Sequence, residues 1–113
     1  MPVREPIDLA AEAGSGTYDN HPVAEVNDHV VRISTMFEPF YWHVHPDSDE
    51  SFLSIEGGLR IEFADHVVEL APGQLYTVPR GVPHRTAPVG ARSVNLTFEH
   101  RDAGMVRVDP PGT

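Results

Sequence analysis

The amino-acid sequence predicts a single all-β domain, and three observations support that prediction. The chain of 113 residues has room for one ordinary domain. Its 11 prolines and 9 glycines imply many chain reversals and leave little room for long helices. From Val23 onward, short stretches with the character of strands alternate with pairs of turn-forming residues. We therefore expect a compact fold of short strands.

Eight turn-forming pairs separate the expected strands, and their spacing leaves about one strand between neighbouring turns. Glycine and proline favour turns because they allow or impose backbone angles that regular strands do not use. The pairs are Asn27-Asp28, Glu38-Pro39, Pro46-Asp47, Gly57-Gly58, Ala64-Asp65, Pro72-Gly73, Arg80-Gly81 and Val89-Gly90.

The chain divides into three parts. Residues 1–20 form a lead-in, within which residues 7–13 are expected to make two helical turns that end at the glycines of 14–16. Residues 21–100 form the β-domain. Residues 101–113 form a polar tail that we expect to be loose, although residues 105–108 could add an edge strand.

Two strands carry information about how the sheets are covered. In residues 59–63, apolar and charged side chains alternate, so one face of this strand is expected to contact water. Residues 52–55 instead place apolar side chains on both faces, which is typical of a strand covered on both sides. The second cover would be either the partner subunit of a homodimer or a chain terminus laid over the sheet.

The charge balance and the missing residue types exclude several functions. The chain has 17 acidic residues against 8 arginines, a formal net charge of −9, and it contains neither lysine nor cysteine. Nucleic acids and anionic membranes would repel such a chain. Schiff-base catalysis and P-loop nucleotide binding need lysine, and thiol catalysis and disulfides need cysteine. With no recognisable targeting or membrane-spanning segment, we expect a cytoplasmic protein.

Three histidines and one glutamate have the spacing of a metal site. His43 and His45 are two residues apart, so on a β-strand both imidazoles project from the same face. The turn at 46–49 lets Glu50 return on the next, antiparallel strand. His84 follows a loop whose two prolines and one glycine restrict its path. These four side chains would supply three imidazoles and a carboxylate.

The spacing around these residues resembles the two sequence motifs of the cupin superfamily. In the first stretch, His43-Val44-His45 is followed by four residues, Glu50, six residues and Gly57. In the second, Gly73 is followed by five residues, Pro79-Arg80-Gly81, two residues and His84. The fifteen residues between Gly57 and Gly73 are similar to the short linkers of small single-domain bacterial cupins. Residues 42–46 and 75–84 most resemble the cupins described as mannose-6-phosphate-isomerase-like.

This resemblance implies a fold, a ligand set and a range of reactions. The fold would be the cupin double-stranded β-helix, a jelly-roll β-sandwich barrel. His43, His45, Glu50 and His84 would bind one divalent transition metal per chain, either iron, manganese, nickel, copper, cobalt or zinc. Four protein ligands would leave up to two positions of an octahedral ion for a substrate.

The resemblance favours a dioxygenase-like oxidoreductase acting on a small, oxygen-bearing, chelating substrate. Isomerase, lyase or cyclase activity, or non-catalytic binding of a small molecule, are the alternatives, because the fold does not choose among them. Glu50 would either remain a metal ligand or detach and act as a general base.

Other residues around the site are open to more than one interpretation. Four aromatic side chains could line an apolar pocket or simply fill the core: Phe40, Phe52, Tyr76 and Phe98. Arg32 shares its strand face with Ser34, opposite Val31 and Ile33, so we expect it on the outer face. If it pointed inward, it could bind a carboxylate.

Overall fold

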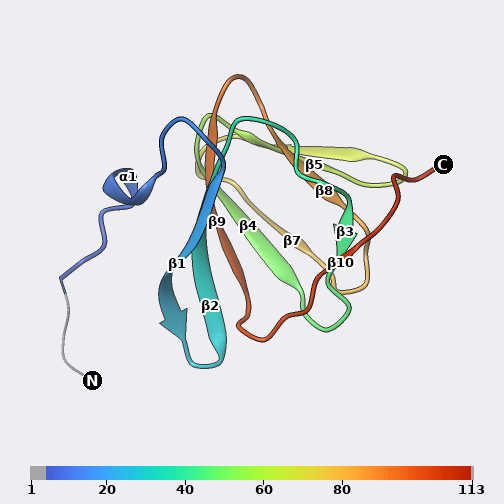
Figure 1. Cartoon of the computed structure of the whole chain (residues 1–113), viewed down its shortest axis with the longest axis horizontal. Helices are drawn as coiled ribbons and strands as arrows, with labels where there is room; N and C mark the ends of the chain where they lie inside the picture. The colour runs from blue at the N-terminus through green and yellow to red at the C-terminus, as the bar shows by residue number, and fades with distance from the viewer. Residues whose placement is uncertain (1–4, 113) are drawn as a thin grey trace.

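The structure, a computed structural model, describes residues 5–112 and places ten strands and one short helix within them (Figure 1). In chain order the elements are α1 (Leu9–Glu12), β1 (Asp19–Val26), β2 (His29–Met36), β3 (His43–Val44), β4 (Glu50–Glu56), β5 (Leu59–Glu62), β6 (Val67–Leu70), β7 (Leu75–Val78), β8 (Arg85–Pro88), β9 (Ser93–His100) and β10 (Val106–Arg107). The predicted all-β fold is confirmed. None of the described helices has the length and apolar character needed to cross a membrane.

The strands form antiparallel sheets. The largest has the order β1-β2-β9-β4-β7, a second has the order β6-β5-β8, and β10 pairs with β3 in a small third sheet. Strands distant in sequence, such as β2 and β9, are neighbours along their whole length. This arrangement is the two-sheet jelly roll that the motifs implied.

The predicted turns lie where the chain reverses. Each of the eight turn-forming pairs falls between two consecutive strands. The first strand, however, begins at Asp19 rather than at Val23. Residues 19–22 pair with 32–35 on β2, and a bulge at Val23 separates this pairing from the rest of β1. Because β1 is at the sheet edge, Pro22 can lie in it without removing a hydrogen bond from a central ladder.

The main apolar core lies between the two large sheets. Its buried residues come from β2, β4 and β7 on one side and from β5, β6 and the turn after β5 on the other: Met36, Phe52, Val78, Leu59, Ile61, Leu70 and Phe63. In β5 the burial alternates, with Leu59 and Ile61 inside and Arg60 exposed, as the sequence predicted.

A second apolar cluster covers the outer face of the five-stranded sheet. Its buried members, Val31, Ile33, Val94 and Leu96, alternate with the inward-facing residues of β2 and β9. Leu53 and Ile55 of β4 pack against this cluster and are half-buried, so β4 does contact apolar residues on both faces. Leu9 and Ala13 pack there too. The N-terminal segment therefore supplies part of the cover, and the homodimer stays a prediction.

The two ends of the chain are tied to the barrel. Helix α1 lies beside the five-stranded sheet (Figure 1) and begins at Asp8, whose carboxylate accepts a hydrogen bond from the Ala10 N–H. At the other end, β10 forms the edge strand expected within residues 105–108, and the Val108 N–H donates to the Trp42 carbonyl. The tail is docked over residues 104–108 rather than loose throughout.

Two glycines of the motifs differ in the space that the structure leaves for a side chain. Gly57 and Gly73 both have positive φ, +80° and +90°, which costs an L-residue about 1–2 kcal/mol. A Cβ on Gly57 would overlap the backbone oxygen of Arg92, whereas a Cβ on Gly73 would meet nothing within 4 Å. We expect Gly57→Ala to lower the free energy of unfolding by about 1–3 kcal/mol more than Gly73→Ala. Urea unfolding of both variants measures this difference, and equal losses would contradict it.

Candidate metal centre

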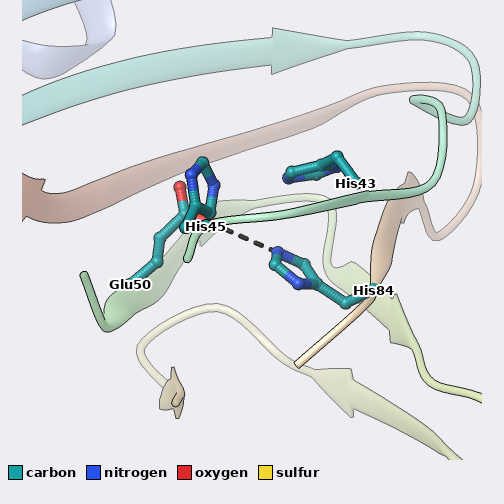
Figure 2. A group of neighbouring side chains, drawn as sticks. All are labelled: His43, His45, Glu50 and His84. Carbon is teal, nitrogen blue, oxygen red and sulfur yellow. Dashed lines mark hydrogen bonds and ion pairs between the residues drawn. The ribbon is translucent and has the colours of Figure 1, made fainter. Parts of the chain in front are cut away.

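The four predicted metal ligands come together at one point inside the barrel (Figure 2). Each offers one ligand atom, and these atoms all lie within 4.8 Å of one another. All four side chains are buried, and His84 is only 1% exposed. The grouping that the sequence predicted is therefore present in the folded chain.

Backbone hydrogen bonds explain why the ligands meet. His43 and His84 form an isolated antiparallel bridge, in which the N–H of each donates to the carbonyl of the other at 3.0 Å. Residues paired in this way direct their side chains to the same face of the ladder. The Gly81 N–H also donates to the His45 carbonyl at 2.8 Å, which ties the second motif to the end of the first. Glu50 opens β4 directly after the turn.

Each imidazole is oriented by a hydrogen bond from its outer nitrogen. The Nδ1 atoms of His43, His45 and His84 lie 2.9 Å from the carbonyl oxygens of Tyr41, Gly104 and Val82. Because a carbonyl can only accept, Nδ1 must carry the hydrogen in all three rings. In its neutral form, each ring then presents the lone pair of Nε2 toward the centre. Metal-binding histidines are held in this way by backbone carbonyls.

The donor set fits a divalent transition metal. His45 Nε2 is buried, and although it lies 3.1 Å from Glu50 Oε1 it has no hydrogen-bond partner among the described residues. His84 Nε2 lies 3.4 Å from the same oxygen. When the His45 ring is neutral, this buried nitrogen lacks a donor, which is costly, and a metal ion would satisfy it. Imidazole and carboxylate donors suit several first-row metals, so the ligand set does not choose among them.

The metal-free cluster has strongly shifted pKa values. Burial opposes ionisation of Glu50, but His45 and His84 outweigh it and lower the pKa of that carboxyl to about 2. Burial also opposes protonation of His45, but Glu50 outweighs it and raises the pKa of that ring to about 9. Burial lowers the pKa of His43 to about 4. At neutral pH Glu50 is therefore an anion and His45 its protonated counter-ion.

Three of the four clustered residues, His43, His45 and Glu50, line a cavity of about 330 Å³. Two of the four predicted pocket residues, Phe40 and Phe52, line it. Tyr76 packs instead against the inner apolar core. Phe98 packs against the cluster on the outer face of the sheet, because it shares the strand parity of Val94 and Leu96. The polar lining comes mainly from β2 and β9: Arg32, Ser34, Asn95, Thr97 and Glu99.

Two functional candidates in the cavity were not identified correctly from the sequence. Arg32 was expected on the wrong face of its strand, and Glu99 was missed. Arg32 lines the cavity, whereas we expected it on the outer face. Glu99 lines it too, with Oε2 at 3.8 Å from His45 Nε2 and without a hydrogen-bond partner in the described chain. Burial, together with the charge of Glu50, raises the pKa of Glu99 to about 7. The alternation Asn95, Thr97, Glu99 was the available signal, but parity alone does not say which face is inside.

The C-terminal segment completes the site. Ala103 and Met105 line the cavity, and the carbonyl of Gly104 holds the His45 ring. Asp47, in the turn between the ligands, accepts the Gly104 N–H at 3.0 Å. This turn therefore anchors the segment that orients a ligand, and Asp47 is not itself part of the ligand cluster.

Replacing one ligand should remove the metal. We expect His84→Ala to lose bound metal, because it removes one of four donors and leaves Glu50 with fewer partners. His29→Ala is the matched control, since this exposed histidine lies outside the cluster. Elemental analysis of both purified variants gives moles of metal per chain. Unchanged metal content in His84→Ala would rule out the ligand set.

Metal binding should release a proton from His45. At pH 7 the metal-free ring is protonated, because its pKa is raised to about 9, and Nε2 must lose that proton before it can bind a metal. We expect release of about one proton per metal, and an affinity that rises as the pH increases toward 9. Calorimetric titration at pH 7 in two buffers with different ionisation enthalpies measures the proton count. Equal heats in both buffers would show that Nε2 is already free.

Comparison with known proteins agrees with the fold and the site. Residues 34–98 match the model of the Cupin domain family. The uncharacterized protein YdbB of Bacillus subtilis is 41% identical over 91 residues, which cover 80% of each chain.

Solved structures show the same fold. A cupin-2 domain protein of Shewanella frigidimarina has a TM-score of 0.78 at 29% identity, covering 84% of this chain and 94% of its own. A double-stranded β-helix protein of Klebsiella pneumoniae has a TM-score of 0.79 at 18% identity, covering 95% and 99%. The matched region contains all four clustered ligands. With both motifs, the β-sandwich and the family match in agreement, the chain belongs to the cupin domain family.

Proposed function

We propose that this cupin is a metal-dependent enzyme of the dioxygenase type, acting on a small substrate that chelates the metal through oxygen. One observation carries the proposal: three members of the buried cluster, His43, His45 and Glu50, line a cavity of about 330 Å³. A purely structural metal site is usually closed, whereas a site beside a cavity can admit a substrate. A redox-active metal bound there would bring a chelating substrate and dioxygen together.

The residues of the cavity would bind and orient such a substrate. Phe40 and Phe52 provide apolar walls that exclude water beside the ligands. Thr97 and Asn95 of β9, the strand beside Phe52, provide hydrogen-bonding groups in the lining. In this proposal Glu50 acts as a ligand rather than as a general base, because its carboxylate is held by His45 and His84.

The cavity favours a small acid or diol over a sugar phosphate. A phosphate monoester is usually bound by several cations. Arg32 is the only arginine among the described residues that line this cavity. The narrower likeness to mannose-6-phosphate-isomerase-like cupins therefore does not carry over to a proposed substrate.

The identity of the metal tests the proposed reaction. We expect the untagged protein to contain about one transition metal per chain and the iron- or copper-loaded form to consume oxygen with catechols or β-diketones. His84→Ala should lose both metal and oxygen consumption, while His29→Ala should retain both. An oxygen electrode measures the rate. Full metal loading by zinc, nickel or manganese without oxygen uptake would contradict the dioxygenase and favour an isomerase, a lyase or a binding module.

A further inference from the structure

Arg32 faces the cavity from the second strand of the five-stranded sheet. In the register of the sheet, Phe52 of β4 pairs with Thr97 of β9, and Thr97 pairs with Arg32 of β2. These three residues form one row across the sheet, and all of them line the cavity. Arg32 therefore lies on the inner face, in the row next to Glu50, which is two residues from Phe52.

The guanidinium of Arg32 is fixed in place without a direct ion pair, although its charge acts on Glu99 in the same cavity. Its Nε donates to Asn20 Oδ1 at 2.6 Å, and Asn20 Nδ2 in turn donates to the Tyr18 hydroxyl at 3.2 Å. Four other arginines form ion pairs with glutamates: Arg60, Arg85, Arg92 and Arg101. Across residues 5–112, Arg32 forms no ion pair with a carboxylate. Its terminal nitrogens therefore remain available to a ligand.

Asn95 adds a second donor to the same part of the cavity. It is 1% exposed, it lines the cavity, and its Nδ2 has no hydrogen-bond partner among the described residues. It pairs with Ser34, so Asn95 and Arg32 are diagonal neighbours, about 7–8 Å apart between Cα atoms. A buried amide donor without a partner costs stability, and a bound acceptor would remove that cost.

We propose that Arg32 and Asn95 form a carboxylate-binding subsite, so that the substrate is a small acid whose carboxylate is separate from the oxygens that chelate the metal. This inference rests on the proposed function, because the other end of the substrate would bind at the metal centre. Strands lie about 4.8 Å apart, which places Arg32 about 10 Å across the sheet from β4, where Glu50 begins the strand. The side chains of Arg32 and Glu50 both reach inward from this sheet. A short dicarboxylic acid can bridge the span that remains between them.

Charge and geometry favour a carboxylate at this subsite. The planar guanidinium donates two parallel hydrogen bonds to the two oxygens of a carboxylate. Arg32 carries one positive charge and is the only arginine among the described residues lining this cavity, so the subsite suits a monoanionic end group better than a phosphate dianion.

Pairs of matched ligands distinguish binding at this subsite from chelation of the metal. Malate and 2-hydroxyglutarate carry a chelating 2-hydroxy acid and a second carboxylate, while 2-hydroxybutyrate and 2-hydroxyvalerate keep the chelating group and lack the second carboxylate. Calorimetry on cobalt(II)-loaded protein gives each dissociation constant, and the visible spectrum of cobalt reports chelation. We expect at least one diacid to bind about 10- to 100-fold more tightly than the monoacid that matches it.

Variants of the same loaded protein assign the effect to the subsite. Arg32→Gln should abolish the preference for the diacid and leave the affinity for the monoacids within about twofold of that of the unsubstituted protein. Arg32→Lys should retain part of the preference for the diacid. Asn95→Ala should weaken diacid binding about 3- to 10-fold. Arg60→Gln, which removes an exposed arginine outside the cavity, should change nothing.

The outcomes distinguish this inference from the proposed function. If cobalt binds in full and the monoacids change its spectrum, but no diacid binds more tightly, the subsite is ruled out and the metal centre stands. Equal loss of diacid and monoacid affinity in Arg32→Gln would also overturn the subsite. If no metal can be loaded, the proposed function fails first and the inference fails with it.

Discussion

The backbone bridge between His43 and His84 is the interaction on which the site depends. It joins the two motifs through two hydrogen bonds of 3.0 Å. Because the bridge fixes two imidazoles on one face, only the turn after His45 is needed to add Glu50. The loop at 79–83 leads directly into His84. The hydrogen bond from its Gly81 N–H to the His45 carbonyl holds this loop against the first motif. The ligands are thus positioned by backbone pairing rather than by side-chain packing.

The same cluster creates an electrostatic problem that a metal would solve. Burying Glu50 as an anion is costly unless a cation lies beside it. In the metal-free protein a proton on His45 supplies that cation, which is why the pKa of this ring is raised to about 9 and that of Glu50 is lowered to about 2. A divalent ion would replace the proton and also satisfy the Nε2 atoms. Folding and metal binding are therefore coupled through one buried carboxylate.

The sequence predicted the fold class, the turns and the metal ligands, because each depends on local spacing. His43 and His45 are two positions apart, so they share a face on any strand, and the residues after them form a turn. The direction of Arg32 could not be predicted in the same way. Parity divides β2 into an apolar face with Val31 and Ile33 and a more polar face with Arg32 and Ser34, and we took the apolar face to be the interior.

In the structure both faces of this sheet are covered, and the inner one is the more polar. The outer face meets α1 and the apolar cluster, whereas the inner face of β2 and β9 borders the cavity. Phe98, for which pocket lining and core filling were both open, packs against the outer apolar cluster. The contribution of Gly104 was beyond prediction, because it acts through a backbone carbonyl and depends on where the tail docks.

The polar inner face of the sheet affects which substrates the cavity can select. Chelation at a metal discriminates poorly among small molecules with two neighbouring oxygens, since the ion contacts only those atoms. If Arg32 also binds the substrate, the substrate must be long enough to reach from the metal to the guanidinium. Arg32 and Glu50 belong to one sheet, with β9 between their strands, so the spacing of hydrogen-bonded strands sets their separation. Substitutions of core residues that do not line the cavity, such as Leu59 or Leu70, would alter stability while leaving this span nearly unchanged.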